Sequence, residues 1–397
     1  MEIAMVFDGL QVGGIERVGA DYANLLVSLG HKVTVFNLRP KLTDMEKEFS
    51  SKCSITHINF PRKFAPEQYA QLIKYNYIGK LLYPILYTGI TILNSIYKII
   101  CYRNHLSRKR YDLIIAFSGH FNDLTFVSSN FLKTKKKMCW LHGALYGYLL
   151  ISDGYFNLYK KIKNLVVLID DAQDEVLITN RNPSLNIYKL YNPTFIKNRI
   201  VNEKIVKKLQ QKYGRFLIMV SRFEYPHKDQ FTVANALKIC RETYGDNINL
   251  LFLGNGPDEK RVKKHVMTLG EEIKKHIFFM GNQNEVQNYY SAAYMLVHAS
   301  IAGEGLPTVM LEALAYNLPM VVTDSKVGPR EILGNDEYGL LCKVKDSEDM
   351  AQKIHQLLTN KDLYKYYKNN SKKRLKAFEA DTIQIQLKNI LDNVMSQ

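Results

Sequence analysis

The sequence predicts an α/β protein with two doubly wound parallel-sheet domains in tandem, and three observations favour this fold class. Apolar runs of strand length alternate with helix-length segments through most of the 397 residues. Strands that alternate with helices form parallel sheets that are covered by helices on both faces. A turn-rich junction, Tyr191-Asn192-Pro193, divides the series into two, and a chain of this length favours two domains.

The predicted domain limits follow from this junction. We expect the first domain at residues 1–195 and the second at residues 196–378. Residues 379–397 form a C-terminal segment, in which Asp381–Val394 has the apolar spacing of an amphipathic helix. Packing of this helix back on the first domain is one way to bury its apolar face.

The first domain opens with a β-α-β unit. Glu2–Phe7 is a short apolar run suited to a buried strand, and a helical pattern follows it. Gly30 stands where a helix-ending glycine belongs, and Lys32–Phe36 alternates like a second strand. The further strands expected in this domain are Asp112–Phe117, Lys137–Leu141, Leu165–Ile169 and Ile187–Leu190.

The second domain repeats the alternation of strands and helices. Its expected strands are Phe216–Val220, Asn249–Leu253, His276–Met280, Tyr294–His298 and Met320–Thr323. Ligands of open parallel sheets bind outside the carboxyl ends of the strands. We therefore expect the ligand crevice at these strand ends, between the two domains.

The composition is that of a globular protein, because 46% of the residues are hydrophobic and 23% are charged. The 54 Lys and Arg residues exceed the 38 Asp and Glu residues, so that the formal net charge is +16. Such a charge predicts an anionic partner, which is nucleic acid, a phospholipid headgroup or a phosphorylated substrate. A general bias of the composition toward Lys, Asn and Tyr is the alternative explanation.

The cysteines and the apolar runs indicate the cellular compartment. The five cysteines are far apart and form no C-x-x-C pair, which predicts neither a zinc site nor a disulfide framework and suits a reducing cytosol. The stretch Met1–Asp8 is too short and too acidic for a signal peptide. The longest uncharged run, Leu81–Tyr97, is interrupted by Pro84, Gly89, Asn94 and Ser95 and falls short of a membrane-spanning helix.

The most informative stretch is Ser300–Ala315, which directly follows a predicted strand. Glu304 and Glu312 are separated by seven residues, and Pro307 suits the first position of a helix. Glu304 is then expected in the loop and Glu312 in the helix. A capped helix with two solvated glutamates would have the same spacing.

The start of this helix suits a phosphate. The peptide N–H groups of Thr308 and Val309 have no partner within the helix, and such groups attract anions. A neighbouring carboxylate accepts two hydrogen bonds at once and is therefore able to bind vicinal hydroxyls. A phosphate beside a polyol is the chemistry of a nucleotide sugar.

At these residues the chain resembles the family-4 retaining glycosyltransferases of the GT-B fold, whose E-x7-E motif matches Glu304 and Glu312. The resemblance extends over most of the chain. It implies two Rossmann-like domains that face each other across a cleft, with the nucleotide-sugar donor held mainly by the second. It also implies that Glu304, with Gly305 and Leu306 beside it, contacts the donor sugar at the reacting centre and that Glu312 contacts the ribose.

A basic loop, Ser221–Gln230, follows the first strand of the second domain. Arg222 and Lys228 lie in it, and the two cations are able to converge on one anion. Cations placed there stabilise the negative charge of a departing nucleoside diphosphate. The resemblance implies that Arg222 and Lys228 bind the donor diphosphate; for their loop, an ordinary polar surface loop is the alternative. The resemblance also implies that the loop around Asn282 frames the nucleotide base.

The first domain carries two candidate features at strand ends. Gly13 and Gly14 lie in the first turn, but Gly9, Gly13 and Gly14 do not have the G-x-G-x-x-G spacing of a nicotinamide site. In the resembling family this turn faces the cleft, which implies that Gly13 and Gly14 face it too, with Gly14 near the diphosphate; a simple tight turn is the alternative. His142 ends another strand, and the resemblance implies a catalytic-site residue there, although a single histidine is often structural.

Residues 60–110 carry half of the net charge of the chain, because they contain nine Lys and Arg residues and one acid, Glu67. The same segment is rich in aromatic residues. Basic residues around an apolar, tyrosine-rich stretch are typical of an interfacial segment on an anionic membrane. An ordinary amphipathic helix pair packed on the first domain is the alternative.

Together with these features, the resemblance implies a retaining, metal-independent hexosyltransferase of bacterial surface-polysaccharide synthesis. We expect its substrate to be a nucleotide sugar, with a UDP-linked donor favoured, and we expect it to require no cofactor. The expected acceptor is a hydroxyl of a lipid-linked glycan, at the inner face of the cell membrane. A GT-B nucleotide-sugar epimerase and a nucleic-acid-binding protein are the alternatives; the glutamate spacing opposes the first, and the second lacks a recognised binding motif.

Overall fold

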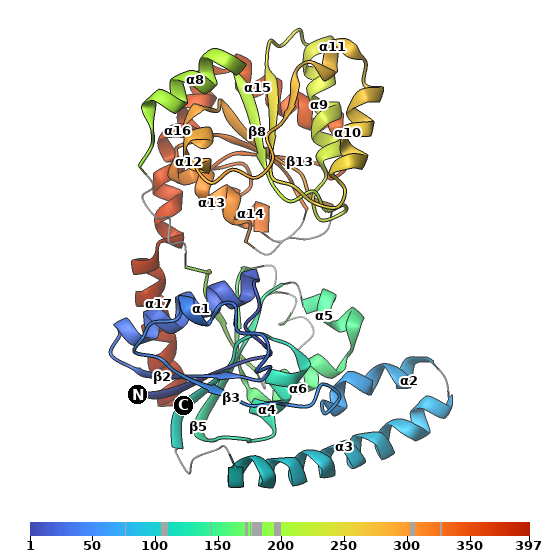
Figure 1. Cartoon of the computed structure of the whole chain (residues 1–397), viewed down its shortest axis with the longest axis vertical. Helices are drawn as coiled ribbons and strands as arrows, with labels where there is room; N and C mark the ends of the chain where they lie inside the picture. The colour runs from blue at the N-terminus through green and yellow to red at the C-terminus, as the bar shows by residue number, and fades with distance from the viewer. Residues whose placement is uncertain are drawn as a thin grey trace. The chain divides into compact units, whose positions relative to one another are not determined.

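The computed structural model describes residues 1–75, 77–104, 110–143, 145–170, 174, 176, 185–193, 200–301, 306–325 and 328–397. The chain divides into two compact units. Unit 1 comprises Met1–Pro193 together with Ile383–Gln397, and unit 2 comprises Thr194–Thr382. Each unit is a parallel sheet with helices on its faces (Figure 1).

The sheet of unit 1 has seven parallel strands within the described residues, in the order β3-β2-β1-β4-β5-β6-β7. Their bounds are β1 Glu2–Phe7, β2 Lys32–Asn37, β3 Ser54–His57, β4 Arg110–Ala116, β5 Lys133–Leu141, β6 Asn164–Val167 and β7 Asn186–Lys189. The order changes direction at β1, where β2 lies on one side and β4 on the other. Ligand crevices form at such a switch point, so the carboxyl ends of β1 and β4 are of functional interest.

The helices of unit 1 differ in how much of their surface is covered. They are α1 Gly14–Ser28, α2 Leu72–Tyr75, α3 Tyr77–Asn104, α4 Phe121–Ser128, α5 Leu145–Ile151, α6 Gly154–Ile162 and the part of α17 Ala380–Ser396 that begins at Ile383, with the 3-10 turns η1 Glu46–Glu48 and η2 Pro66–Gln71. Figure 1 shows α3 as a long helix along the outer side of unit 1, away from the sheet. Gly30 follows α1 with a φ of 82°, which glycine adopts without strain.

The sheet of unit 2 has six parallel strands in its described part, in the order β10-β9-β8-β11-β12-β13. The strands are β8 Phe216–Val220, β9 Asn249–Leu253, β10 Ile277–Phe279, β11 Met295–His298, β12 Met320–Thr323 and β13 Leu340–Cys342. The helices are α8 Glu203–Tyr213, α9 Gln230–Glu242, α10 Glu259–Thr268, α11 Glu271–Lys274, α12 Val286–Ala292, α13 Thr308–Ala315, α14 Gly328–Leu333, α15 Ser347–Thr359 and α16 Lys361–Leu375, followed by η3 Lys376–Phe378.

The predicted strands are all present. Four of them agree with the structure to the residue, among them β8 Phe216–Val220. Two strands were not predicted, β3 and β13. They have four and three residues, which is too short for a clear apolar pattern, and only pairing with β2 and β12 identifies them.

Two sequence predictions need correction. Pro307 is not the first helical residue of α13 but its N-cap, because its ψ of 112° is extended and the helix begins at Thr308. The second concerns the longest apolar run, which was expected to fall short of a spanning helix. Within the described residues, the helical segment Tyr77–Cys101 is long and apolar enough to cross a membrane by length and composition alone. The helix continues through the polar residues: Thr88, Thr91 and Ser95 donate to carbonyls of the helix itself, and Asn94 donates to the Phe64 carbonyl outside it.

Candidate functional site

The carboxyl edge of the unit 2 sheet brings two predicted site segments together. β8 and β11 are neighbours, so the loop after β8 meets the segment after β11. The Asp229 amide donates to the Ala299 carbonyl at 2.9 Å, and the Ile301 amide donates to the Pro226 carbonyl at 3.1 Å. The basic loop is thereby fixed beside the stretch that leads to α13.

Arg222 and Lys228 both lie in this loop, in different surroundings. The Arg222 side chain is exposed, and its guanidinium lies 3.3 Å from the Glu224 carboxylate. The Lys228 side chain is partly buried, and its Nζ lies 3.4 Å from Nε2 of His298, the last residue of β11. Lys228 therefore lies at the end of β11, whereas the Arg222 side chain is exposed in the loop.

The glycine turn after β9, residues 254–256, packs against the backbone of the loop that contains Arg222. The Gly254 backbone has a φ of +121°, and a Cβ added to it would lie 2.2 Å from the Ser221 carbonyl oxygen. A Cβ on Gly256 would lie 2.4 Å from the Phe223 carbonyl oxygen. Because backbone packs against backbone here, both positions require glycine.

Glu312 lies in α13 and is held by a tyrosine that the sequence analysis did not single out. The Tyr290 hydroxyl, from α12, donates to Oε2 of Glu312 at 2.8 Å. The Tyr290 ring is buried and stacks on Tyr316, with 5.7 Å between the ring centroids. One carboxylate oxygen is thus engaged by the protein, and the hydrogen bond fixes the orientation of the other.

The remaining predicted residues of unit 2 are placed as follows. Thr308 and Val309 form the first turn of α13, as expected for an anion-binding helix start, and Leu306 precedes it. Glu304 and Gly305 lie outside the described residues. Asn282 is exposed in the loop after β10, and that loop contacts the glycine turn through the hydrogen bond from the Gly254 amide to the Gly281 carbonyl, at 2.8 Å.

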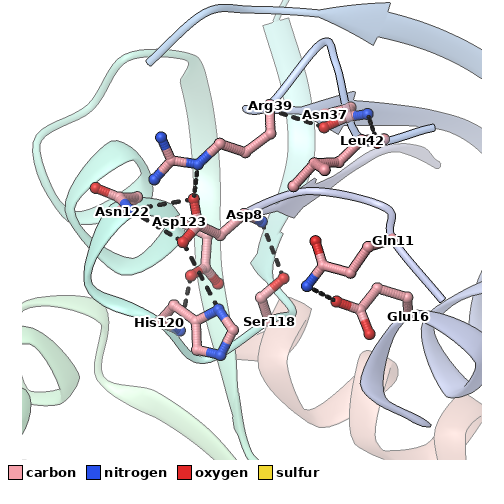
Figure 2. A network of polar contacts seen from close by, with 10 residues as sticks. All are labelled: Asp8, Gln11, Glu16, Asn37, Arg39, Leu42, Ser118, His120, Asn122 and Asp123. Atoms are coloured by element: carbon pink, nitrogen blue, oxygen red, sulfur yellow. Dashed lines mark hydrogen bonds and ion pairs between the residues drawn. The ribbon is translucent and has the colours of Figure 1, made fainter. Parts of the chain in front are cut away.

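The carboxyl edge of the unit 1 sheet carries a charged cluster around Asp8. Asp8 follows β1, and Figure 2 shows three side chains converging on its carboxylate. Arg39 Nε donates to it at 3.0 Å, Asn122 Nδ2 donates at 2.9 Å, and His120 Nδ1 lies at 3.7 Å. The Asp8 amide donates to Ser118 Oγ at 2.9 Å, which ties the ends of β1 and β4 together.

Asp123 fixes the backbone of the same cluster. Its carboxylate accepts from the amides of Gly119 and His120 at 2.9 and 2.8 Å, and so closes the start of α4. Burial, opposed by the positive charge of His120, raises the pKa of Asp123 to about 7. The hydrogen bond with Asp8 raises the pKa of His120 above its usual value. The cluster therefore changes charge close to neutral pH.

The glycine turn lies at the start of α1. Gly13 is the N-cap, with Glu16 Oε2 only 2.2 Å from where a Cβ would stand. Glu16 accepts from Gln11 Nε2 at 2.9 Å, and burial raises the pKa of its carboxyl (Figure 2). No protein atom of the described residues lies within 4 Å of a Cβ built on Gly14. Packing inside unit 1 therefore does not explain the glycine at position 14.

His142 follows β5, the next strand along the sheet from β4. Its Nε2 lies 2.5 Å from the Phe117 carbonyl oxygen, and its ring lies 5.0 Å from the Phe117 ring centroid. A carbonyl only accepts hydrogen bonds, so Nε2 must carry the proton. Burial lowers the pKa of His142 to about 4, which makes the ring neutral at neutral pH and leaves Nδ1 unprotonated.

The sequence analysis missed Asp8, His120 and Asp123, although a signal for two of them existed. Asp8 directly follows the first strand and His120 lies four residues beyond β4, so each is at a strand end as His142 is. A search for polar residues at all predicted strand ends would have found both. The described residues contain no group of three or more His, Cys, Asp or Glu side chains arranged to hold a metal ion.

A known protein family matches most of unit 2. Residues 201–374, nearly all of unit 2, match the family described as glycosyl transferases group 1. The match covers unit 2 and agrees with the resemblance that the sequence shows in this part of the chain. The two parallel-sheet units have the GT-B architecture of solved glycosyltransferases, as the structural matches show.

Curated relatives match over part of their length. An N-acetylgalactosamine-N,N'-diacetylbacillosaminyl-diphospho-undecaprenol 4-alpha-N-acetylgalactosaminyltransferase of Campylobacter jejuni is 28% identical over 48% of this chain and 49% of its own. A second N-acetylgalactosaminyltransferase of that organism, named for a diNAcBac-PP-undecaprenol acceptor, is 24% identical over 49% of this chain and 51% of its own. The chain thus spans about half the length of these relatives.

Solved structures match over almost the whole chain. Anabaena HepE in complex with UDP has a TM-score of 0.73 at 17% identity and covers 99% of this chain and all of its own. The lipopolysaccharide outer core galactosyltransferase WaaB has a TM-score of 0.68 at 17% identity and covers 99% of both chains. At this identity the likeness concerns the fold.

Proposed function

We propose that this protein is a retaining, metal-independent glycosyltransferase that moves a hexose or N-acetylhexosamine from a UDP-linked donor to a glycan hydroxyl. The observation that carries this proposal is the edge of unit 2, where Lys228 lies beside His298 and its loop bonds to the residues after β11, inside the region that matches the family. Cations beside a carboxylate-bearing helix suit the diphosphate and hydroxyls of a nucleotide sugar.

The donor would be held by groups of different chemistry. Arg222 and Lys228 bind the diphosphate, and the amides of Thr308 and Val309 add hydrogen bonds to it. Glu312, oriented by Tyr290, accepts from the ribose hydroxyls, while Glu304 contacts the sugar. The loop with Asn282 frames the base. Binding of UDP by Anabaena HepE, a protein of the same fold, supports UDP as the nucleotide.

The glycine turn and His142 of unit 1 complete the proposed machinery. Gly14 would let a phosphate approach the start of α1, since no described atom occupies the space beside it. The protonated Nε2 of His142 is used by Phe117, so its unprotonated Nδ1 accepts a hydrogen bond from a substrate hydroxyl. In a front-face retaining reaction the leaving phosphate takes the acceptor proton, and His142 serves to orient the reacting sugar.

The acceptor is proposed to be a lipid-linked glycan of bacterial surface polysaccharide. The named undecaprenyl-diphosphate acceptors of two Campylobacter relatives support this class. A cytoplasmic enzyme, peripheral at the inner face of the cell membrane, would meet both substrates. Neither nucleic acid nor an organic cofactor is needed.

A screen of donors tests the nucleotide assignment. UDP-glucose, UDP-galactose and their N-acetyl forms are compared with the GDP sugars by thermal shift and by slow donor hydrolysis, with and without EDTA. Stabilisation and hydrolysis with UDP sugars alone, unaffected by EDTA, are expected. A response confined to GDP sugars would show that the donor nucleotide is GDP and not UDP. No response to either group of sugars would contradict the proposed function.

Substitutions then test the site. Arg222→Ala and Glu304→Ala are expected to abolish most transfer while the thermal midpoint of the free protein stays unchanged. Lys208→Ala, an exposed residue of α8, is the matched control and should keep full activity. Unchanged turnover in both site variants would refute the assignment, and conversion of the donor without acceptor would indicate an epimerase.

A further inference from the structure

Helix α3 exposes an apolar face that unit 1 does not cover. The most exposed aliphatic residues recur every three or four positions, with a gap at Thr88 and Gly89, and therefore form one stripe along the helix. Each has between 51% and 69% of its surface exposed; they are Ile78, Leu81, Ile85, Ile92, Ile96 and Ile99. We call this stripe the outer face of α3. A continuous exposed face of this kind marks an interaction surface.

Three polar residues of α3, Asn94, Tyr97 and Lys98, lie on the opposite, inner face and bond to unit 1. Asn94 Nδ2 donates to the Phe64 carbonyl at 2.6 Å, and the Tyr97 hydroxyl donates to the Asn59 carbonyl at 2.5 Å. Lys98 Nζ donates to the Ser129 carbonyl at 3.2 Å. The amphipathicity of α3 is therefore inverted relative to an ordinary surface helix, whose apolar side faces the protein.

The hydroxyl groups that remain on the exposed side are satisfied within the helix. Thr88 Oγ1 donates to the Pro84 carbonyl at 2.8 Å, and Thr91 Oγ1 donates to the Tyr87 carbonyl at 2.7 Å. Ser95 Oγ donates to the Thr91 carbonyl at 3.0 Å. Because a polar group without a partner is costly in hydrocarbon, these bonds lower the cost of placing α3 in an apolar phase.

The charge around α3 is positive. The helix contains no Asp or Glu, and Lys80 lies exposed near its start. Arg62 and Lys63 are exposed in the segment that bonds to Asn94 and Tyr97. The acid Glu67 is buried and paired with Lys161 at 2.6 Å, so it does not offset these cations. An exposed apolar face on a helix without acids, next in the sequence to a segment with exposed cations, is complementary to anionic lipid headgroups.

We propose that α3 lies flat in the headgroup region of an anionic bilayer, with its outer face toward the acyl chains and its inner face on unit 1. A membrane span would require α3 to leave the partners of Asn94, Tyr97 and Lys98, which hold it along one side of unit 1. A helix of 28 residues extends about 42 Å, enough for a broad contact in the plane of the membrane. This docking does not depend on the proposed catalytic activity.

A second copy of the chain is the competing occupant of the outer face. Pairing of two α3 helices would bring Lys80, Arg62 and Lys63 of both copies close to one interface. The described residues of this segment offer no exposed acid to balance these charges. Like charges at an interface oppose association. The observations therefore favour the lipid surface.

Vesicle co-sedimentation of the full chain tests the proposal. Vesicles of phosphatidylcholine with about one third phosphatidylglycerol are compared with phosphatidylcholine alone, at low salt and at about 0.5 M salt. We expect binding to the anionic vesicles that is at least tenfold stronger than to neutral ones and that salt weakens. No binding to anionic vesicles at low salt would overturn the proposal.

Two matched variants localise the contact. Ile85→Ser/Ile92→Ser removes two residues of the outer face and is expected to reduce vesicle binding at least tenfold. Met267→Ser/Ile385→Ser removes two equally exposed apolar residues of other helices and should bind as the unchanged protein does. Equal loss in both variants, or no loss in the first, would contradict docking through α3.

The mode of docking is tested by extraction and by the oligomeric state. Alkaline carbonate should release the bound protein from the vesicles, because a helix in the headgroup region does not span. Retention in the membrane after this treatment would overturn the in-plane arrangement. A lipid-free dimer that Ile85→Ser/Ile92→Ser dissociates, without vesicle binding by the unchanged protein, would assign the outer face to self-association instead.

Discussion

Single hydrogen bonds orient the groups that would meet the donor and the acceptor. Tyr290 fixes one oxygen of Glu312, and Phe117 takes the proton-bearing nitrogen of His142. In both cases a neighbouring aromatic residue decides which atom of the functional group remains available. These constraints lead to predictions at the scale of the residue.

Removal of the Tyr290 hydroxyl should weaken donor binding. A hydrogen bond to a charged group contributes about 1.5–3 kcal/mol, so Tyr290→Phe is expected to raise the KM for the donor about tenfold or more. Steady-state kinetics measure this change. Tyr364→Phe, which removes a 2.9 Å bond to the Tyr294 carbonyl elsewhere in unit 2, should leave the KM unchanged. An equal effect of both variants would indicate a general loss of stability.

The Asp123 carboxyl should make stability depend on pH. Its pKa is about 7 in the folded protein and near 3.8 for an unperturbed carboxyl in the unfolded chain, so the folded state binds the proton more tightly. Stability is then greatest at low pH and falls as the pH rises through 7, by about 1 kcal/mol between pH 6 and 8.5. Denaturant unfolding at several pH values measures this. A smaller slope is expected for Asp123→Asn, and an undiminished slope in that variant would exclude Asp123 as the cause.

The neutrality of His142 predicts a second pH effect. Because its pKa is about 4, protonation of His142 should not reduce transfer between pH 5.5 and 8. His142→Ala should lower kcat at least about tenfold, since the substrate hydroxyl loses the hydrogen-bond acceptor Nδ1 that orients it. A pH-rate profile of the unchanged enzyme with a limb near 6.5 that His142→Ala removes would contradict this interpretation.

At the scale of elements, loops after neighbouring strands build the edge of each sheet. The loop with Arg222 rests on the glycine turn after β9 and is bonded to the segment after β11. The sequence predicted which loops carry the site, because parallel strands place their carboxyl ends at one edge. The hydrogen bonds between loops could not be predicted, since they depend on the order β9-β8-β11, which joins strands far apart in the sequence.

Gly254→Ala should disturb this support. A Cβ there would stand 2.2 Å from a backbone carbonyl oxygen at a φ of +121°, so we expect a loss of at least about 2 kcal/mol of stability together with reduced transfer. Gly245→Ala is the matched control, since its φ is +68° but its surroundings are open. It should cost only about 1 kcal/mol and leave transfer unchanged. Thermal unfolding and activity assays compare the two.

At the scale of the whole molecule, the candidate groups are distributed over two units with separate sheets. Unit 2 contains the family match and the groups proposed to bind the donor, and unit 1 contains the Asp8 cluster, His142 and α3. The positive charge of the chain is divided as well. Half of it lies in residues 60–110, the segment that contains α3.

Donor binding should accordingly protect unit 2. Hydrogen exchange with and without UDP is expected to show protection in residues 221–229 and 308–312, whereas the sheet core of unit 1 should be unchanged. A ligand at a hundred times its Kd adds about 2.7 kcal/mol to the stability of the unit that binds it. Protection confined to unit 1 would contradict the assignment of donor binding to unit 2.

The sequence by itself determined the strand series and the parallel fold, because these follow from local apolar patterns. It also indicated Arg222, Lys228, Glu312 and His142 as candidate site residues, through strand ends and a motif. Only the tertiary structure decided which partners these residues have. Tyr290 reaches Glu312 from another helix, Asp8 meets His120 across more than a hundred residues, and α3 turns its polar side inward. Such contacts depend on the packing of segments that are distant in the sequence, and periodicity within one segment does not reveal what covers it.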